Sequence, residues 1–503
     1  MKILVDSRQM KLCDSNTIHH FKVPSLVLME RAALGVAEEI AKKIQTGSSI
    51  LVVCGTGNNG GDGLAVGRML VQHGYKVTFV IPGNLAKVTE ETARQLEICK
   101  AYGMEVQKEI PKAEFDAVVD ALFGIGLSRE LKDVYFDIIA QMNRIRAFKV
   151  AVDIPSGIHA DTGAVMGIAF KADITITFAF SKLGLCLYPG AEYAGRIKVK
   201  DIGIGIESFL EEKPCYYELE DKDLVNVPKR KDYSNKGTYG KVFIAAGHKN
   251  MAGAAFLSGK AAYVTGAGLV KLYTEETNRE ILQQLLPEAV MATYEPEQEE
   301  EKELRESIAW ADVIVAGPGM GTGKESESII KTILKEAEIP VILDADGLNI
   351  ISKYKEWLTE TKAAVIVTPH LGEMARLTGK SIFDIQKQLL QVALEFAKAY
   401  NVICILKDAR TVTALPNGTA YINTSGNNGM ATAGAGDVLT GVLAGLTAQK
   451  MELRKAAPLG VYLHGRGGDS ILSRTGNYGM MAQDVIEGVR QTMQDITFDK
   501  EGN

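Results

Sequence analysis

Three loops in the first part of the sequence carry residue types that can bind a ligand or a cation. The stretch CGTGNNGGDG (54–63) packs two asparagines and an aspartate among glycines, and Asp120 and Asp153 each follow an apolar run, FDAVV and FKVAV. The carboxyl ends of parallel strands share one edge of a sheet, so we expect these loops to converge on one site. Asn59, Asp120 and Ser156 then offer oxygen ligands of the kind that hard cations prefer. The backbone N–H groups of the glycine-rich loop, at a helix N-terminus, can bind a phosphate.

The glycine-rich loop raises the question of a dinucleotide-binding fingerprint. Gly55, Gly57 and Gly60 match the pattern G-x-G-x-x-G at a strand-to-helix turn. The fingerprint also needs an acidic residue about 20 positions further on, at the end of the next strand. That strand, KVTFVIPGN (76–84), has no carboxylate. The sequence therefore disfavours an ordinary dinucleotide cofactor site.

Each of the three loops also has a plainer explanation as turn or cap chemistry. This explanation would cover Gly60 and Gly61 as a tight turn, Asp120 as a turn cap, and the stretch from Pro155 to Gly157 as a simple loop. It is adequate for one loop taken alone. The convergence of three such loops at one sheet edge favours a binding site.

One loop in the second part of the chain is the most informative, TAGAGDVLTG (432–441). Gly434, Ala435 and Gly436 open a predicted helix, and Asp437 lies in its first turn. Small residues there let backbone N–H groups point at a transferring phosphate and stabilise the charge that develops on it. Asp437 beside this anion hole can take the proton of a hydroxyl under attack. The plainer alternative is a carboxylate that the helix dipole favours.

Further loops at predicted strand ends add cationic and imidazole groups. Lys407 and Arg410 follow an apolar run, and two cations at a strand end suit a nucleotide phosphate. His370 precedes a Leu-Gly-Glu helix start, where it either contacts a substrate or only satisfies local hydrogen bonds, and both interpretations stay open. His464, on the apolar stretch PLGVYLHGRGG, is expected to be a packed helix residue.

The sequence alternates short β-rich runs with amphipathic helical stretches, which is typical of parallel sheets covered by helices on both faces. The segment 206–237 interrupts this rhythm, because it is rich in charge and proline and shows no core-forming pattern. We therefore predict an α/β protein with a boundary near Glu212 to Asp223, and two three-layer αβα domains, 1–213 and 222–503. The predicted strands of the first are ILVVC, KVTFV, FDAVVD, FKVAVD, DITITF and GRIKV, and those of the second are KVFIAAG, LVKLY, VIVAG, VILDA, AVIVTP and VICILK.

Composition narrows the class of protein. The chain has 503 residues, of which 23 % are charged and 46 % hydrophobic, and a net charge of −6, so it lacks the electrostatic signature of a protein that binds nucleic acid or anionic membranes. Its six cysteines are far apart and form no C-x-x-C pair, which argues against a zinc site or a disulfide framework. Neither a signal peptide nor a membrane-spanning apolar run is visible, so we expect a cytoplasmic protein. The acidic run 295–306 is expected to be a solvated helix start.

The motifs NNGGDG, VVDALFGIGLSRE and VDIPSG, spread from residue 58 to 157, resemble the epimerase domain of the NAD(P)H-hydrate repair enzymes. That family interconverts the R and S epimers of NADHX and NADPHX, the hydrated forms of NADH and NADPH. The resemblance implies a Rossmann-like domain in which Asn59, Asp120 and Ser156 bind potassium and Asp153 contacts the reactive end of the substrate, where we expect it to shuttle protons. It also implies substrate binding by Asn58, Asn59, Gly60, Gly61, Asp62, Gly124, Ile125, Gly126, Leu127, Ser128, Arg129 and Glu130.

The GAGD sequence at 434–437 resembles the ribokinase-like superfamily, and TPHLGE, KDART and GPGMG narrow the resemblance to its NAD(P)H-hydrate dehydratase branch, over nearly all of 236–487. GAGD stands where that branch often has GSGD, and it is also a sugar-kinase form, so the substrate is inferred from the other loops. The resemblance implies hydrate binding by Ala254, Gly319, His370 and Asp437, with Asp437 as the catalytic base. It implies nucleotide binding by Lys407, Asp408, Ala409, Arg410, Thr411 and Gly436.

The two resemblances together imply a bifunctional metabolite-repair enzyme. It would epimerise the hydrates and dehydrate the S form with a nucleotide phosphoryl donor and Mg²⁺. ADP is the expected donor, although no residue separates ADP from ATP. The expected partners are NADHX, NADPHX and the nucleotide, in a homo-oligomer that binds neither nucleic acid nor membrane. Two alternatives stay open: a ribokinase-like kinase of a vitamin precursor, and a first domain that is a non-catalytic binding module.

Overall fold

The structure is a computed structural model that describes residues 1–295 and 301–498. The chain divides into two compact units, Lys2–Tyr216 and Tyr217–Asn503, the second joined by Met1. The domain limits 1–213 and 222–503 stay a prediction, because contacts alone do not establish which segments fold independently. Part of the acidic run lies outside the described residues, and α10 (Glu301–Trp310) begins directly after that gap.

The first unit is built around a sheet of seven strands in the order β4-β3-β2-β5-β6-β7-β9, and every neighbouring pair is parallel. The short strands β1 and β8 pair in parallel apart from this sheet. The strands are β1 (Lys2–Val5), β2 (Ser49–Cys54), β3 (Lys76–Val80), β4 (Val106–Gln107), β5 (Ala117–Ala121), β6 (Phe148–Val152), β7 (Ile174–Phe178), β8 (Ser181–Lys182) and β9 (Arg196–Lys200). The helices are α1 (Ser7–His19), α2 (Ser25–Ala41), α3 (Asn58–Gln72), α4 (Glu90–Ala101), α5 (Asp133–Arg144), α6 (Leu183–Cys186) and α7 (Gly190–Ala194).

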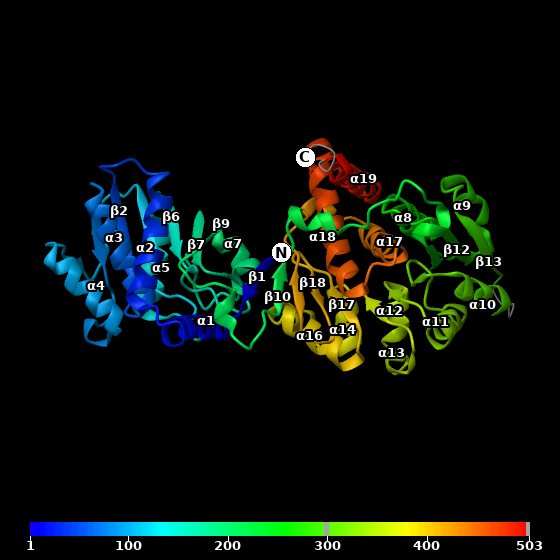
Figure 1. Cartoon of the computed structure of the whole chain (residues 1–503), viewed down its shortest axis with the longest axis horizontal. Coiled ribbons are helices and arrows are strands. Elements are labelled where there is room, and N and C mark those ends of the chain that lie inside the picture. The colour runs from blue at the N-terminus through cyan, green and yellow to red at the C-terminus, as the bar shows by residue number, and fades with distance from the viewer. Residues whose placement is uncertain (296–300, 499–503) are drawn as a thin grey trace. The chain divides into compact units, whose positions relative to one another are not determined.

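Strand β2 explains why helices cover both faces of this sheet. Successive side chains of a strand point to opposite faces, so a strand that is apolar at every position must be buried on both sides. Ile50 and Val52 pack into the core that includes residues of α2, α3 and α4, while Leu51 and Val53 pack into a second core with residues of α5. The first unit is therefore a three-layer αβα arrangement, which can be followed in Figure 1.

The second unit has a sheet with the strand order β13-β12-β11-β14-β15-β16-β17-β18-β19. The pairs from β13 to β17 are parallel, and β17, β18 and β19 form an antiparallel meander at the end. Its strands are β11 (Lys241–Ala245), β12 (Leu269–Glu275), β13 (Val290–Tyr294), β14 (Val313–Ala316), β15 (Val341–Leu343), β16 (Val365–Val367), β17 (Ile403–Leu406), β18 (Val412–Ala414) and β19 (Ala420–Ile422), and β10 (Tyr216–Glu218) straddles the division of the chain. Its helices after the linker are α8 (Ala252–Val264), α9 (Arg279–Leu285), α10, α11 (Lys324–Glu336), α12 (Asp346–Ile351), α13 (Trp357–Glu360), α14 (Leu371–Thr378), α15 (Ile382–Lys387), α16 (Leu389–Tyr400), α17 (Ala435–Ala448), α18 (Leu453–Thr475) and α19 (Ala482–Phe498).

Helix α17 is the central helix of the second unit. Leu439 and Leu443 pack into the core over the sheet, while Val438 and Val442 pack into another core with residues of α18 and α19. A helix that is apolar on all sides is buried, as α17 is. Gly441 lets α8 approach closely, because a Cβ there would lie 2.2 Å from the carbonyl oxygen of Ser258. This packing fixes the position of the α17 N-terminus, where the GAGD sequence lies.

The linker segment 206–237 contributes to the cores, although no core-forming pattern was expected there. Phe209 packs into the core of the first unit, and Leu224 and Val227 pack into a core of the second. Each comes from or directly follows a short 3₁₀ turn, Ile206–Phe209 or Asp221–Asn226. Single apolar residues on such turns have no period of 2 or 3.6, so pattern analysis misses them.

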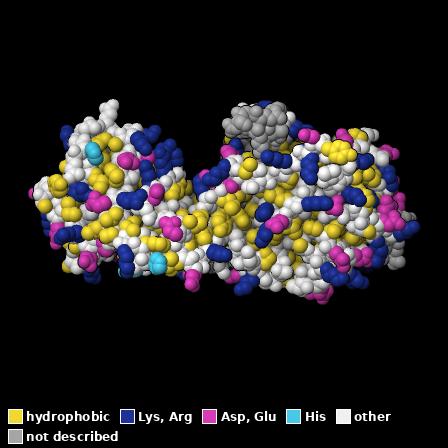
Figure 2. All heavy atoms as spheres, viewed as in Figure 1, with side chains coloured by type: hydrophobic (Ala, Val, Ile, Leu, Met, Phe, Trp, Pro, Cys, Tyr) yellow, Lys and Arg dark blue, Asp and Glu magenta, His cyan; other side chains and the backbone are white. Residues whose placement is uncertain are grey.

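The described residues include no helix with the length and apolarity that a bilayer crossing requires. All six cysteines are free thiols in the structure. On the face shown in Figure 2, lysine and arginine are interspersed with aspartate and glutamate.

Candidate functional sites

The predicted binding loops of the first unit meet at one cavity of about 640 Å³. It lies at the carboxyl ends of β2, β5 and β6, where a parallel sheet binds ligands. Its lining includes the predicted residues Asn58, Asn59, Asp62, Gly124 through Arg129, and Asp153. Gly60, Gly61 and Glu130 do not line it, and Glu130 is an exposed residue paired with Lys132.

The glycines of NNGGDG do not form a turn, so the tight-turn explanation is wrong. Gly60 and Gly61 lie within α3, and neither has a positive φ. A Cβ on Gly60 would lie 1.9 Å from the carbonyl oxygen of Gly55, and one on Gly61 would lie 2.7 Å from Cε of Met29. Glycine is required here by close packing, which holds the N-terminal turn of α3 against its neighbours. Backbone N–H groups that stay free at such a helix N-terminus can bind an anion.

Asp120 and Ser156 form a buried pair beneath the cavity. Asp120 is fully buried and accepts hydrogen bonds from the hydroxyl of Ser156 at 2.6 Å and from its backbone N–H at 2.7 Å. A third bond from the N–H of Leu122 at 3.2 Å is the turn cap anticipated from sequence. Burial raises the pKa of Asp120 to about 6, although the bonds from Ser156 and Leu122 oppose that rise.

The neighbouring turn connects this pair to Asn59. The N–H of Phe123 donates to the hydroxyl oxygen of Ser156 at 2.9 Å, and a Cβ on Gly124 would lie 3.5 Å from Cβ of Asn59. The amide nitrogen of Asn59 is buried and has no hydrogen-bond partner among the described residues. The oxygen atoms of the Asn59 amide, the Asp120 carboxylate and the Ser156 hydroxyl are hard ligands, and such a set fits an alkali cation such as potassium.

Asp153 has a partner that sequence inspection did not identify. It directly follows β6 with a φ of 67°, and its Oδ1 lies 2.6 Å from Nζ of Lys182. Lys182 is only 1 % exposed and also lines the cavity. The only sequence signal was a lysine within an apolar stretch, AFSKLGL, because the pairing joins residues 29 positions apart.

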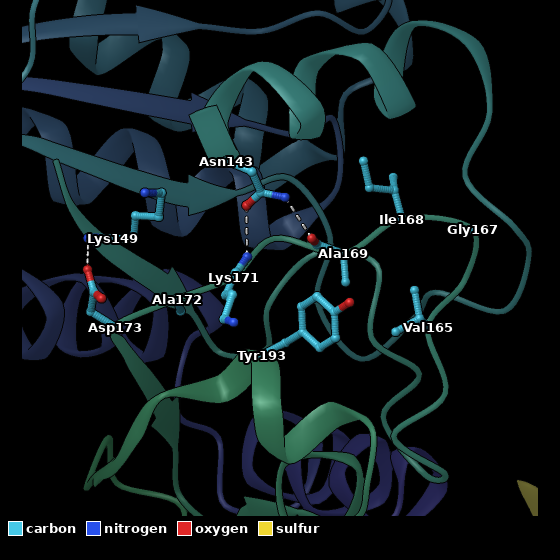
Figure 3. A pocket seen from close by; sticks show the side chains of 10 residues that line it. All are labelled: Asn143, Lys149, Val165, Gly167, Ile168, Ala169, Lys171, Ala172, Asp173 and Tyr193. Atoms are coloured by element: carbon cyan, nitrogen blue, oxygen red, sulfur yellow. Dashed lines mark hydrogen bonds between the residues drawn. The ribbon is translucent and has the colours of Figure 1, made fainter. Parts of the chain in front are cut away.

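A second cavity of about 450 Å³ lies at the amino ends of β6 and β7 and is shown in Figure 3. The amide of Asn143 accepts from the N–H of Lys171 and donates to the carbonyl of Ala169, both at 2.9 Å. The carboxylate of Asp173 accepts from the N–H of Lys149 at 2.8 Å. These polar side chains bond to the backbone of the cavity wall, so they serve the local fold and do not converge on a ligand.

The GAGD sequence of the second unit lies against a buried ion pair. Nζ of Lys407 is 2.7 Å from Oδ1 of Asp344, and a Cβ on Gly436 would lie 3.3 Å from that same Nζ. Burial alone would lower the pKa of Lys407, but Asp344 and Glu373 outweigh it and hold the pKa above its ordinary value. Lys407 is therefore a fixed cation next to the first turn of α17. Asp344 has no role in the sequence prediction, although it lies in the predicted strand VILDA (341–345).

Asp437 is adjacent to this ion pair and has the properties of a general base. It lies in the first turn of α17, after Gly434 with a φ of 85°. Burial and the charge of Asp344 raise the pKa of Asp437 to about 7, while Lys407 opposes the rise. A carboxylate with a pKa near neutrality accepts a proton in the transition state more effectively than an ordinary aspartate.

His370 makes the local hydrogen bonds that were one of its two interpretations. Its Nδ1 accepts from the N–H groups of Gly372 at 2.9 Å and Glu373 at 3.3 Å, and the backbone N–H of His370 donates to the carboxylate of Glu373 at 2.8 Å. This is a capping box at the start of α14. Burial lowers the pKa of His370 and raises that of Glu373 to about 7. More than half of the imidazole stays exposed, so a substrate contact remains sterically open.

The remaining predicted residues of the second unit form two groups. Gly319 and Ala254 are adjacent, since a Cβ on Gly319 would lie 2.8 Å from Cβ of Ala254. The residues 407–411 form the hairpin turn between β17 and β18, where Arg410 donates to the carbonyl of Thr424 at 3.0 Å. A backbone bridge between His370 and Lys407 joins that turn to the start of α14.

His464 lies inside α18, as expected for a packed helix residue. Its Nε2 is buried and has no hydrogen-bond partner among the described residues. Burial lowers the pKa of His464 to about 4, so the imidazole is neutral at pH 7.

Family matches and full-length relatives both relate this chain to NAD(P)H-hydrate repair proteins. A family described as NAD(P)H-hydrate dehydratase matches residues 242–491, and a family described as YjeF-related protein N-terminus matches residues 25–184. The bifunctional NAD(P)H-hydrate repair enzyme of Thermofilum pendens is 36 % identical over 98 % of this chain and 96 % of its own length. The enzyme of the same name from Moorella thermoacetica is 35 % identical over 98 % and 97 %. A ribokinase-like superfamily protein of Enterococcus faecalis aligns with a TM-score of 0.50 at 27 % identity, over 57 % of this chain and 98 % of that one.

Proposed function

The chain belongs to the family of bifunctional NAD(P)H-hydrate repair enzymes. From this premise we propose which unit and which residues carry out each of the two reactions. The first unit is the epimerase, which interconverts the R and S forms of the hydrated cofactor. The second unit is the dehydratase, which returns the S form to NAD(P)H at the expense of a nucleotide phosphoryl group. The first unit supplies the second with the epimer that it accepts.

The epimerase assignment is supported by the convergence of Asp153 with the helix turn 58–62 and the loop 124–129 on one cavity. Epimerisation requires that the hydroxyl leave C6 and that water return to its other face, with a group that holds and moves the proton. Asp153 is the candidate for that group, because its carboxylate faces the cavity and is held in place by Lys182. Asn59, Asp120 and Ser156 are the residues that would hold potassium, which supplies fixed positive charge close to the substrate.

The dehydratase assignment is supported by Asp437, which lies in the first turn of α17 with a pKa near 7. Asp437 deprotonates the C6 hydroxyl, and the oxygen attacks the terminal phosphorus of the nucleotide. The N–H groups around Gly436 and the cation of Lys407 stabilise the negative charge on the phosphoryl oxygens. The nucleotide leaves one phosphate shorter. Phosphate then leaves C6 as the N1 lone pair forms N1=C6, and loss of a proton from C5 to water gives the C5=C6 bond of the dihydronicotinamide. Ala254, Gly319 and His370 bind the hydrate in this proposal.

The nucleotide binds at the hairpin turn 407–411 and at Gly436, and it carries Mg²⁺, which neutralises phosphate charge. The proposal includes either ADP or ATP, since the turn offers a phosphate site without a feature that selects the number of phosphates. The other residues of this turn that would contact the nucleotide are Asp408, Ala409, Arg410 and Thr411.

The deciding experiment is the recovery of reduced-nicotinamide absorbance from a mixture of R and S NADHX, with KCl, MgCl₂ and either ADP or ATP. Complete recovery supports both activities and identifies the nucleotide. Recovery that stops at the S fraction would overturn the epimerase assignment. No recovery with either nucleotide would overturn the dehydratase assignment and point to phosphorylation of a stable alcohol instead.

A further inference from the structure

Lys182 is a buried cation whose hydrogen bonds are all accounted for. Its Nζ donates to Oδ1 of Asp153 at 2.6 Å, to the hydroxyl of Thr177 at 2.9 Å and to the carbonyl of Phe178 at 3.0 Å. An ammonium group that is 1 % exposed has lost its water, and that loss is tolerated only with an anionic partner and full hydrogen bonding. Lys182 therefore forms a buried ion pair with Asp153 and fixes the position of its carboxylate.

The two donors to Asp153 bind the same oxygen. The hydroxyl of Thr177 donates to Oδ1 at 3.0 Å, next to the contact with Lys182. Oδ2 accepts no hydrogen bond from a described residue, and Asp153 lines the cavity. The residue also holds a positive φ of 67°, a conformation that an aspartate adopts at some cost and that recurs at functional sites. One oxygen is thus anchored, and the other is available to a ligand.

Asp62 lines the same cavity under opposite conditions. It lies in the second turn of α3, and its carboxyl group makes no hydrogen bond or ion pair with any described residue. Burial, together with the negative charges of Asp153 and Asp14, raises the pKa of Asp62 well above its ordinary value. Two carboxyl groups of one cavity therefore have contrasting environments, one paired with a cation and the other unpaired. Such contrasts separate an acid from a base.

We propose that Asp153 and Asp62 form a base and acid pair for epimerisation, and that Lys182 is the positioning residue that determines which of them is the base. The inference rests on the epimerase function proposed above. The lone pair of N1 forms the N1=C6 bond as the C6–O bond breaks, and the departing hydroxyl takes the proton of Asp62 and leaves as water. A water molecule then adds to the other face of C6, the N1=C6 electrons return to N1, and Oδ2 of Asp153 takes the proton of that water.

The step is balanced in atoms and charge. One water leaves, one water enters, and one proton moves from Asp62 to Asp153. Proton exchange with water in the cavity returns the proton to Asp62 before the next turnover, and the same two groups catalyse the reverse epimerisation with their roles exchanged. No oxidant, reductant or further reactant is needed.

The pH dependence of epimerisation depends on all the charged groups that face this cavity. Besides Asp62, Asp153 and Lys182, the charged residues that line the cavity are Lys11, Asp14, Glu91 and Arg129, and His19 acts on Asp14 from the same helix. Burial and Asp153 raise the pKa of Asp14 as well. A substitution of Lys182 must therefore be compared with one of Asp62 before a pH limb is assigned to either carboxyl group.

The test measures the rate at which pure R NADHX converts to S, by chromatographic separation of the epimers, between pH 5 and 9. Lys182→Met, which keeps the length of the side chain, is expected to lower epimerase kcat at pH 7 about 100-fold and to move the acidic limb of the profile to higher pH. Lys182→Arg is expected to recover at least part of the rate and the original limb. Asp62→Asn is expected to lower kcat about 100-fold and to remove the alkaline limb. Lys198→Met, which breaks an ion pair with Glu39 outside the cavity, is the matched control.

The outcomes separate this inference from the proposed function. If the wild-type protein does not epimerise, the proposed function fails and the acid–base pair fails with it. If the wild type epimerises and Asp62→Asn keeps its full rate, Asp62 is not the acid and the pair is wrong, while the epimerase assignment stands. An unchanged pH profile in Lys182→Met at a reduced rate would make Lys182 a structural residue only. If that variant does not fold, as judged by its unfolding midpoint, Lys182→Arg and Asp62→Asn decide the matter.

Discussion

Nζ of Lys407 lies 2.7 Å from Oδ1 of Asp344, although 63 positions separate the two residues in the chain. The pair lies against Gly436, one residue before Asp437. Since Asp344 raises the pKa of Asp437 and Lys407 lowers it, the pair sets the basicity of the proposed catalytic carboxylate. Four testable predictions follow from this pair and from the other relationships described above.

The dehydratase activity should depend on the ionised form of Asp437. The pKa of Asp437 is about 7, so its carboxylate is protonated below this pH and ionised above it. The second-order rate constant kcat/KM for S NADHX, which reports the ionisation of the free enzyme, is expected to rise with pH through about 7 and then to level off. Asp437→Asn should lower that rate about 1000-fold at every pH. Its epimerase activity, measured on R NADHX, is the internal control, and a variant with normal dehydratase activity would remove Asp437 from the mechanism.

Removal of the cation at position 407 should affect both activity and stability. In Lys407→Met the pKa of Asp437 loses the influence that lowers it, so the midpoint of the dehydratase pH profile should move upward. The same change leaves Asp344 buried without its partner, which is expected to cost about 3 kcal/mol of unfolding free energy. Chemical denaturation of the variant measures that loss. The double variant Lys407→Met with Asp344→Asn should recover much of the stability, and no recovery would show that the ion pair is not its source.

Gly57, the N-cap residue of α3, and Gly60, in its first turn, provide a matched pair for a packing test. A Cβ on Gly60 would lie 1.9 Å from the carbonyl oxygen of Gly55, whereas a Cβ on Gly57 would meet nothing within 4 Å. Gly60→Ala should therefore destabilise the first unit by about 3 kcal/mol and abolish epimerase activity. Gly57→Ala should unfold at the wild-type temperature. Thermal unfolding of both variants checks this, and equal stability of the two would contradict the packing role of Gly60.

Potassium should bind and stabilise the first unit through the donor set of Asn59, Asp120 and Ser156. A ligand that binds only the folded state raises its stability, so KCl should raise the unfolding temperature above that in NaCl of equal ionic strength. Asn59→Ala should remove this difference. Asn84→Ala, which removes only an exposed cap to Ala86, should keep it. A KCl effect that survives in Asn59→Ala would place the cation elsewhere.

The sequence alone determined the architecture and predicted where both candidate sites lie. Apolar runs such as SILVV and KVFIA predict buried strands because every residue must be covered on both faces, and the structure confirms them as β2 and β11. Polar residues directly after such runs must then lie at the carboxyl edge of a sheet. This reasoning placed Asn59 and Asp153 without coordinates, and the small residues of GAGD placed Asp437 in the first turn of a helix, since these positions follow from local order along the chain.

Only the tertiary structure decided how these residues are supported. Lys182 and Asp344 are partners of Asp153 and Lys407 through contacts across the fold, and no spacing in the sequence encodes those contacts. The glycines of NNGGDG show the same limit. A run of glycines predicts a turn because glycine has conformational freedom. Here Gly60 must be glycine for another reason, since a Cβ at this position would clash with the carbonyl oxygen of Gly55. Local patterns determine which element forms and where it ends, but pairing and close packing depend on distances that exist only after the chain has folded.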